Sequence, residues 1–170
     1  MTRVFKPVCL ITVLALVLAL GAAIVPIGYT QAAGGTYYVD AVGGSDANGG
    51  TDPTTDAWET ITHALATVSG GNPADPDIIN VAAGTYDAAN GETFPLAFDD
   101  SGVTLQATGA ATIDGGNTGV ILDVNADGIV IDGFTITNAT GSAGINVEDS
   151  DGGFSIINNT FTNMNTGVVW

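Results

Sequence analysis

The sequence predicts an all-β fold in which short parallel strands wind into a solenoid of stacked coils. Apolar residues recur in columns with a period near 25 residues through the second half of the chain. Within each short run, apolar and polar residues alternate with the period of two that is typical of a strand. Glycine, asparagine and aspartate separate the runs, as they do at turns. Together these features indicate three short strands per coil.

Three sets of columns place like side chains one above another on successive coils. They comprise Val103, Ile129 and Phe154 with Leu105, Ile131 and Ile156; Ile136 and Phe161 with the flanking pairs Thr135 and Thr160, Thr137 and Thr162, and Asn138 and Asn163; and Val120, Ile145 and Val168 with Leu122, Val147 and Trp170. Successive coils would pair as parallel strands about 4.8 Å apart, and stacked asparagines would share side-chain hydrogen bonds. A β-sandwich also has many short strands, but it gives no reason for this repeat.

The first half of the chain is less regular. A strand is expected at 36–42, followed by a loop over 43–56 that is rich in glycine, aspartate, asparagine and threonine. Strands of the first coil are expected at 77–82 and 94–98. Because a solenoid needs a cover over its open end, the segment that precedes the first coil is expected to supply it.

An amphipathic helix over 57–68 is the predicted cover. Asp56 and Glu59 have the spacing of a capping box, in which Asp56 is the N-cap. The apolar face of this helix comprises Trp58, Ile61, Leu65 and Val68. We therefore expect an N-terminal capping helix that packs on the first coil.

The N-terminus has the pattern of an export signal. Arg3 and Lys6 are the only basic residues, and an apolar run over 8–25 and the small residues Ala32 and Ala33 follow them. An uncleaved membrane anchor is the alternative, because the run approaches the ~20 residues that span a bilayer. The predicted domains are a signal peptide at 1–33, the N-terminal strand, loop and capping helix at 34–76, and β-helix coils at 77–170, where the chain stops in mid-strand and is expected to be truncated.

Charge limits the partners of the mature domain. The whole chain has a net charge of −16, from 18 acidic residues and two basic ones. The mature domain lacks the two basic residues of the signal, so its net charge is −18. Nucleic acid and anionic membranes offer such a surface no favourable Coulomb energy, so both are excluded as direct partners. An extracellular polysaccharide or a cell-surface component is the expected partner, although an acidic polysaccharide would need bridging divalent cations. The expected location is secreted or at the cell surface.

Four segments of the chain resemble the opening of secreted right-handed parallel β-helix proteins. They are 37–40 (YYVD), 44–51 (GSDANGGT), 57–61 (AWETI) and 78–86 (IINVAAGTY). The group includes pectate-lyase-like enzymes and a widespread domain of unknown function at the N-terminus of bacterial and archaeal surface proteins. The resemblance implies a right-handed parallel β-helix, but it implies no activity, because many chemistries and many non-enzymes share this opening.

The residues of the mature chain do not form a convergent catalytic set. Lyases that resemble this chain use arginine or lysine as the base, and none follows Lys6. His63 lies on the predicted solvent side of the helix and is interpreted as structural or exposed. Paired carboxylates could hydrolyse a glycan, but the available aspartates do not gather on one face, and several are expected at turns. The five aspartates considered are Asp99, Asp100, Asp114, Asp123 and Asp132.

One acidic cluster is a candidate calcium site. Asp123 and Glu148 are separated by one predicted period, so they are expected to point outward on adjacent coils, with Asp149 nearby. Two carboxylates about 5 Å apart without a cation must share a proton or bind a metal, and calcium prefers oxygen ligands. Asp123, Glu148 and Asp149 are therefore the predicted metal ligands, with a solvated acidic edge as the alternative. The loop over 46–52 has alternating oxygen ligands, but turn chemistry explains it equally well.

These observations favour a non-catalytic function. We expect a secreted or surface-displayed β-helix domain with a structural, adhesive or glycan-contacting role. No cofactor is predicted with certainty, and calcium is the one candidate. The alternative is a polysaccharide-degrading enzyme, a carboxylate-based hydrolase or a relative of the lyases, whose active site lies beyond residue 170.

Overall fold

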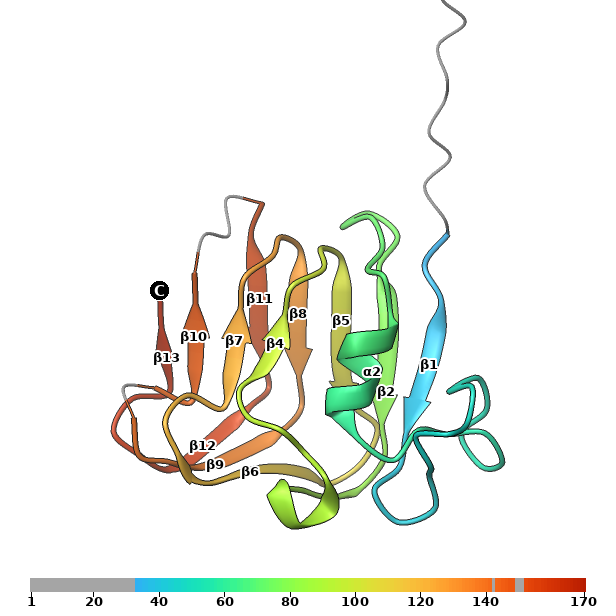
Figure 1. Cartoon of the computed structure of the whole chain (residues 1–170). Coiled ribbons are helices and arrows are strands. Elements are labelled where there is room, and N and C mark those ends of the chain that lie inside the picture. Colours follow the sequence, from blue (N-terminus) through green and yellow to red (C-terminus); the bar gives the residue numbers. More distant parts are fainter. Residues whose placement is uncertain (1–32, 142, 149–151) are drawn as a thin grey trace, which may run out of the picture. The chain divides into compact units, whose positions relative to one another are not determined.

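The computed structural model describes residues 33–141, 143–148 and 152–170. They form a parallel β-helix in which three sheets enclose one apolar core and a single α-helix lies near the N-terminal end (Figure 1). The predicted all-β solenoid is therefore confirmed. The predicted signal peptide lies outside the described residues except for Ala33. None of the helices in the described ranges has the length and apolar character required to cross a bilayer.

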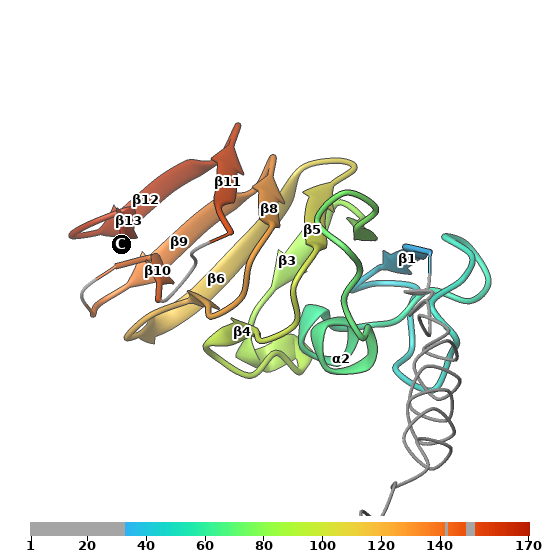
Figure 2. The ribbon, with the colours of Figure 1, turned by 90° about the horizontal axis from the view of Figure 1, so that it is seen from above.

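Each sheet contains strands from successive coils, and every pair of neighbouring strands is parallel. Sheet 1 comprises β1 (Thr36–Val39), β2 (Asp77–Val81), β5 (Val103–Ala107), β8 (Ile129–Asp132) and β11 (Phe154–Ile157); sheet 2 comprises β4 (Leu96–Phe98), β7 (Leu122–Val124), β10 (Ile145–Val147) and β13 (Val168–Val169); and sheet 3 comprises β3 (Gly84–Tyr86), β6 (Ala111–Thr118), β9 (Thr135–Ala139) and β12 (Thr160–Met164). Figure 2 shows the strands of sheet 3 side by side. The helices are α2 (Ile61–Thr67) and the short 3-10 helix η1 (Ala88–Asn90).

The strand register confirms the predicted columns in sheets 1 and 3. In sheet 1, Leu105 pairs with Ile131, and Ile131 pairs with Ile156. In sheet 3, Ile136 pairs with Phe161. These side chains point into the helix, and Leu105, Ile131 and Ile136 have no exposed surface. The period read from the sequence is thus the period of the core residues in sheets 1 and 3.

In sheet 2 the first member of each predicted column is wrong by two residues. Ile145 pairs with Leu122 and not with Val120, whereas its predicted pairing with Val168 is confirmed. The facing residues Asp123 and Asn146 are therefore 23 residues apart in the sequence. A shift by two residues leaves every side chain on the same face, so the alternation of apolar and polar residues does not reveal it.

A segment that was predicted to be helical extends the outer edge of β1. The Trp58 N–H donates to the Tyr38 carbonyl at 3.0 Å, and the Asp40 N–H donates to the Trp58 carbonyl at 2.9 Å. The indole of Trp58 is 2% exposed and stacks on Tyr37 with 5.3 Å between ring centroids. Extended backbone at Trp58 thus covers a strand edge that would otherwise present unpaired polar groups.

Helix α2 is consequently shorter than the predicted helix over 57–68, and its predicted capping box is wrong. The N-cap is Thr60, whose hydroxyl accepts a hydrogen bond from the His63 N–H at 3.0 Å. Asp56 instead accepts a hydrogen bond from the Gly49 N–H at 2.9 Å in the preceding loop. Because the chain at Trp58 already pairs as a strand, Asp56 is too far from the helix to cap it.

The position of α2 agrees with the predicted capping role. It lies beside β4, the end strand of sheet 2 (Figures 1 and 2). Ile61 and Ala64 have no exposed surface, and Val68 is 4% exposed, so one face of the helix is part of the core. Burial of apolar surface stabilises a fold by about 25 cal/mol per Å². This packing stabilises α2, which would be too short to be stable alone.

Candidate functional site

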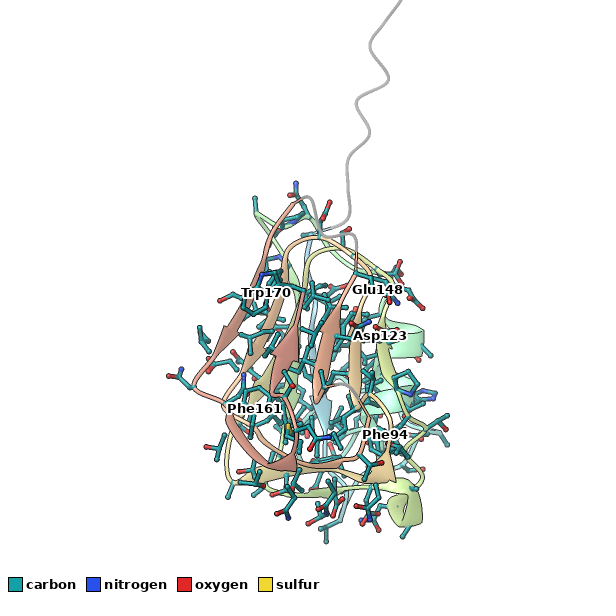
Figure 3. The ribbon with its side chains drawn as sticks, turned by 90° about the vertical axis from the view of Figure 1, so that its left-hand side faces the viewer. Phe94, Asp123, Glu148, Phe161 and Trp170 are labelled. Carbon is teal, nitrogen blue, oxygen red and sulfur yellow. The ribbon has the colours of Figure 1, made fainter. Side chains whose placement is uncertain are left out.

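The outer face of sheet 2 carries a cluster of five polar side chains, named here the acid–amide patch. It comprises Asp99, Asp123, Asn125, Asn146 and Glu148. The Asn146 Nδ2 group donates hydrogen bonds to Asp123 Oδ1 and to Glu148 Oε1, both at 2.9 Å. The Asn125 Nδ2 group donates to Asp99 Oδ1 at 2.9 Å. Two amides thus hold three carboxylates at fixed positions on the surface, and Figure 3 shows Asp123 and Glu148 on the same side of the molecule.

Strand alternation and register build this patch. Leu122 and Val124 have no exposed surface, so Asp123 between them faces outward. Asp123 pairs with Asn146 on the next coil, which places the two side chains within reach of each other. The pairing continues beyond the strands, because the Glu148 N–H donates to the Val124 carbonyl at 2.8 Å. Glu148 is therefore two residues beyond Asn146 on the same outer face.

The structure places two of the three predicted calcium ligands in the patch. Asp123 and Glu148 come together, but Asp123 faces Asn146 across the sheet and not Glu148 as the predicted period implied. Asp149 lies outside the described residues. Within the described ranges, no three histidine, cysteine, aspartate or glutamate side chains are grouped closely enough to hold a metal ion. Calcium binding at Asp123 and Glu148 remains a prediction.

The same pairing of an acid with an amide occurs on the other two sheets. On sheet 1, Asn158 Nδ2 donates to Asp132 Oδ1 at 2.8 Å. On sheet 3, Asn163 Nδ2 donates to Asn138 Oδ1 at 3.2 Å, and Asn138 Nδ2 donates to Asp114 Oδ1 at 2.7 Å. The predicted stacking of Asn138 on Asn163 is confirmed. Both residues also have positive φ, of 63° and 51°, a conformation that asparagine adopts more readily than most residues.

Sequence reasoning missed the acidic partners of these asparagines. An aspartate precedes its amide partner by 23 residues at Asp123, by 24 at Asp114 and by 26 at Asp99 and Asp132. This recurring spacing is the signal that could have found them. In a domain without lysine or arginine, the asparagine N–H groups supply the donors that cationic side chains supply elsewhere. The aspartates therefore serve mainly to join neighbouring coils.

Two further carboxylates hold the start of α2. Asp46 Oδ1 accepts a hydrogen bond from the Thr60 N–H at 3.0 Å. Glu92 is 5% exposed and accepts from the Ile61 N–H at 2.7 Å and the Thr62 N–H at 2.8 Å. Burial raises the pKa of Glu92, although these hydrogen bonds oppose the shift. The otherwise unpaired N–H groups of the first helical turn are thus satisfied by distant residues.

Side chains of the loop over 46–52 make the turn hydrogen bonds that are the alternative to a calcium loop. Asp52 Oδ1 accepts hydrogen bonds from the Thr54 and Thr55 N–H groups, both at 2.9 Å. Hydrogen bonds from Thr54 and then from Thr55 lower the pKa of Asp52 to about 2. Asn48 Nδ2 donates to a backbone carbonyl at 2.9 Å. These side chains therefore stabilise the loop itself.

His63 is half-buried and packs against an aromatic side chain. Its ring lies edge-on to Trp58, with 5.5 Å between ring centroids. The predicted solvent-facing position is therefore only partly correct, while the structural interpretation agrees with this contact.

A groove of about 370 Å³ adjoins the patch between α2 and β4. Its lining comprises the apolar residues Leu65, Ala66, Pro95, Leu96 and Ala97, the hydroxyl residues Thr62 and Thr93, and the carboxylates Asp99 and Asp100. Asp99 belongs to both the groove and the patch, so the two form one continuous surface. The arrangement offers hydrogen-bond acceptors next to an apolar wall, which is the composition of many small-ligand sites.

Comparison with known proteins gives one family. Residues 42–108 match the family described as "Protein of unknown function (DUF1565)". The matched segment contains the loop, α2 and the strands from β2 to β5. No curated protein and no solved structure matches the chain. The similarity thus agrees with the β-helix fold and assigns no chemistry, and the broader pectate-lyase-like resemblance remains a prediction.

Proposed function

We propose that this protein is a secreted or surface-displayed β-helix domain without catalytic activity, and that it contacts extracellular glycans through the outer face of sheet 2. The acid–amide patch is the observation that carries this proposal. Asp99 and Asp123 accept hydrogen bonds from amides of the next coil, and Glu148 accepts one from Asn146 on its own coil. Their remaining oxygen lone pairs are available to a ligand. Such oxygens can accept hydrogen bonds from the hydroxyl groups of a sugar.

The hydrogen-bond partners of the patch support binding more than acid–base catalysis. Asp123 and Glu148 share the two N–H donors of one Asn146 amide. General acid catalysis requires a carboxyl that holds a proton near neutral pH, usually because it lies in an apolar or negatively charged pocket. Glu148 is exposed and Asp123 is half-buried, so water reaches both groups. They are better suited to accept hydrogen bonds from a neutral glycan.

The location rests on the sequence. The basic and apolar pattern of 1–33 supports export, and the net charge of −18 beyond it supports a soluble, self-repelling surface outside the cell. The same charge opposes contact with acidic polysaccharides unless cations bridge the two surfaces. Neutral or positively charged glycans are therefore the favoured partners.

Retention on immobilised neutral polysaccharides tests this proposal. The double variant Asp123→Asn with Glu148→Gln removes the two charges and keeps the side-chain shapes. We expect it to bind more weakly than the wild type, by roughly 1–2 kcal/mol for two charged hydrogen-bond acceptors near the surface. Asp132→Asn is the matched control, because Asp132 has the same amide pairing on sheet 1.

Two outcomes would contradict the proposal. Equal retention of the double variant and the control would show that the acid–amide patch is not part of the binding surface. New reducing ends or unsaturated products after incubation with polysaccharides would show catalysis instead.

A further inference from the structure

The groove between α2 and β4 is lined by apolar side chains and by two carboxylates. Leu65 and Ala66 of α2 and Pro95 and Ala97 beside them provide apolar surface, and Asp99 and Asp100 supply two consecutive carboxylates. A groove with these components combines apolar surface with two carboxylates.

In the described part of the chain, the two carboxylates have no lysine or arginine partner. From Pro7 onward the chain contains no lysine or arginine. Asp99 accepts one hydrogen bond, from the neutral amide of Asn125, and in the described part of the chain no side chain donates to Asp100. Both residues are exposed. Among the described residues no cationic side chain of the chain's lysines or arginines compensates their negative charges, which leaves solvent ions or a positively charged ligand to do so.

We propose that this groove binds an amino sugar that carries a protonated amine, as one unit of a glycan. The inference rests on the proposed glycan contact and names the class of sugar. The ammonium group pairs with Asp99 and Asp100, and the C–H face of the sugar ring packs on Leu65, Ala66 and Pro95. A volume of about 370 Å³ lies within the range of small-ligand sites, which begins at about 300 Å³.

Asp99 connects the groove with the acid–amide patch, so one glycan can contact both. Asp99 lines the groove and also accepts the hydrogen bond from Asn125 in the acid–amide patch. A sugar chain with one unit in the groove can therefore continue across the outer face of sheet 2 toward Asp123 and Asn146. Long-range attraction between a net charge of −18 and a polyamine glycan would also speed the encounter.

Calorimetric titration of the full chain with matched oligosaccharides tests this inference. The probes are oligomers of glucosamine and of N-acetylglucosamine of equal length, at about pH 6, where a primary amine is protonated. We expect the glucosamine oligomer to bind more tightly. Asp99→Asn with Asp100→Asn should weaken its binding by about 3- to 30-fold, the effect of losing two exposed ion pairs. The double substitution should also remove the preference for the glucosamine oligomer over the acetylated oligomer.

A second double variant controls for total charge. Glu59→Gln with Asp75→Asn also removes two exposed negative charges, and neither residue lines the groove. We expect this control to change the affinity by less than about twofold in 0.15 M salt, where distant charges are screened.

The outcomes separate the inference from the proposed function. Equal binding of both oligomers, with no effect of the Asp99 and Asp100 substitutions, would overturn the amine site and leave glycan binding intact. Binding of a lysine peptide but of neither oligomer would also overturn it, in favour of a basic protein partner. Equal losses in the two double variants would reduce the interaction to net charge and contradict the site.

Discussion

Replacement of Asn146 by aspartate is the sharpest perturbation of the acid–amide patch. The wild-type amide donates two hydrogen bonds, to Asp123 and to Glu148, both at 2.9 Å. In Asn146→Asp both donors disappear and a third carboxylate lies between the other two. Each lost bond contributes about 1 kcal/mol, and each like-charge contact near 4 Å costs about 1 kcal/mol in water-like surroundings. Because the site is partly solvated, we expect a loss of about 2–4 kcal/mol in the free energy of unfolding.

Urea denaturation at neutral pH measures this loss, with Asn165→Asp as the control. Asn165 is exposed, and its side chain makes none of the hydrogen bonds described for the coils. If Asn146→Asp and Asn165→Asp unfold at the same urea concentration at neutral pH, the amide does not hold the patch together.

Three other predictions concern the core, the helix start and calcium. Ile131→Ala should lower the free energy of unfolding by about 2–5 kcal/mol in urea denaturation, because Ile131 has no exposed surface; a loss below about 1 kcal/mol would contradict its place in the core. The folded-state pKa of Glu92 is raised above the ordinary 4.5, so its contribution to the free energy of unfolding should fall as the pH rises from 4.5 through the folded-state pKa. Glu92→Gln should remove this pH dependence of the urea midpoint. An unchanged pH dependence in the variant would contradict the raised pKa. Calcium should raise the melting temperature if it binds at Asp123 and Glu148, and an equal melting temperature with chelator would contradict the predicted site.

The periodic part of the fold was predictable because each coil repeats the same packing problem. Leu105, Ile131 and Ile156 are read as one column from their spacing and lie in one column in sheet 1. Asn138 and Asn163 likewise stack as expected. Local periodicity is sufficient for these residues, since like side chains pack against like across parallel strands.

The features that sequence reasoning missed depend on contacts between distant segments. The start of α2 is set by pairing of Trp58 with Tyr38 and by the carboxylate of Glu92, which is 31 residues from Ile61. A local capping pattern at Asp56 cannot compete with these contacts. In sheet 2, turns of unequal length shorten the offset between facing residues by two relative to the predicted period, and alternation with a period of two does not reveal such a change. The pairing of Asp123 with Asn146 followed from that shorter offset.

The register of sheet 2 decides whether the acid–amide patch exists, and nuclear Overhauser contacts between side chains measure it directly. The structure predicts methyl contacts of Ile145 with Leu122 and proximity of the Asn146 amide to Asp123. Contacts of Ile145 with Val120 would set Glu148 beside Asp123 in place of Asn146. That result, or antiparallel contacts between these strands, would contradict the account of the site.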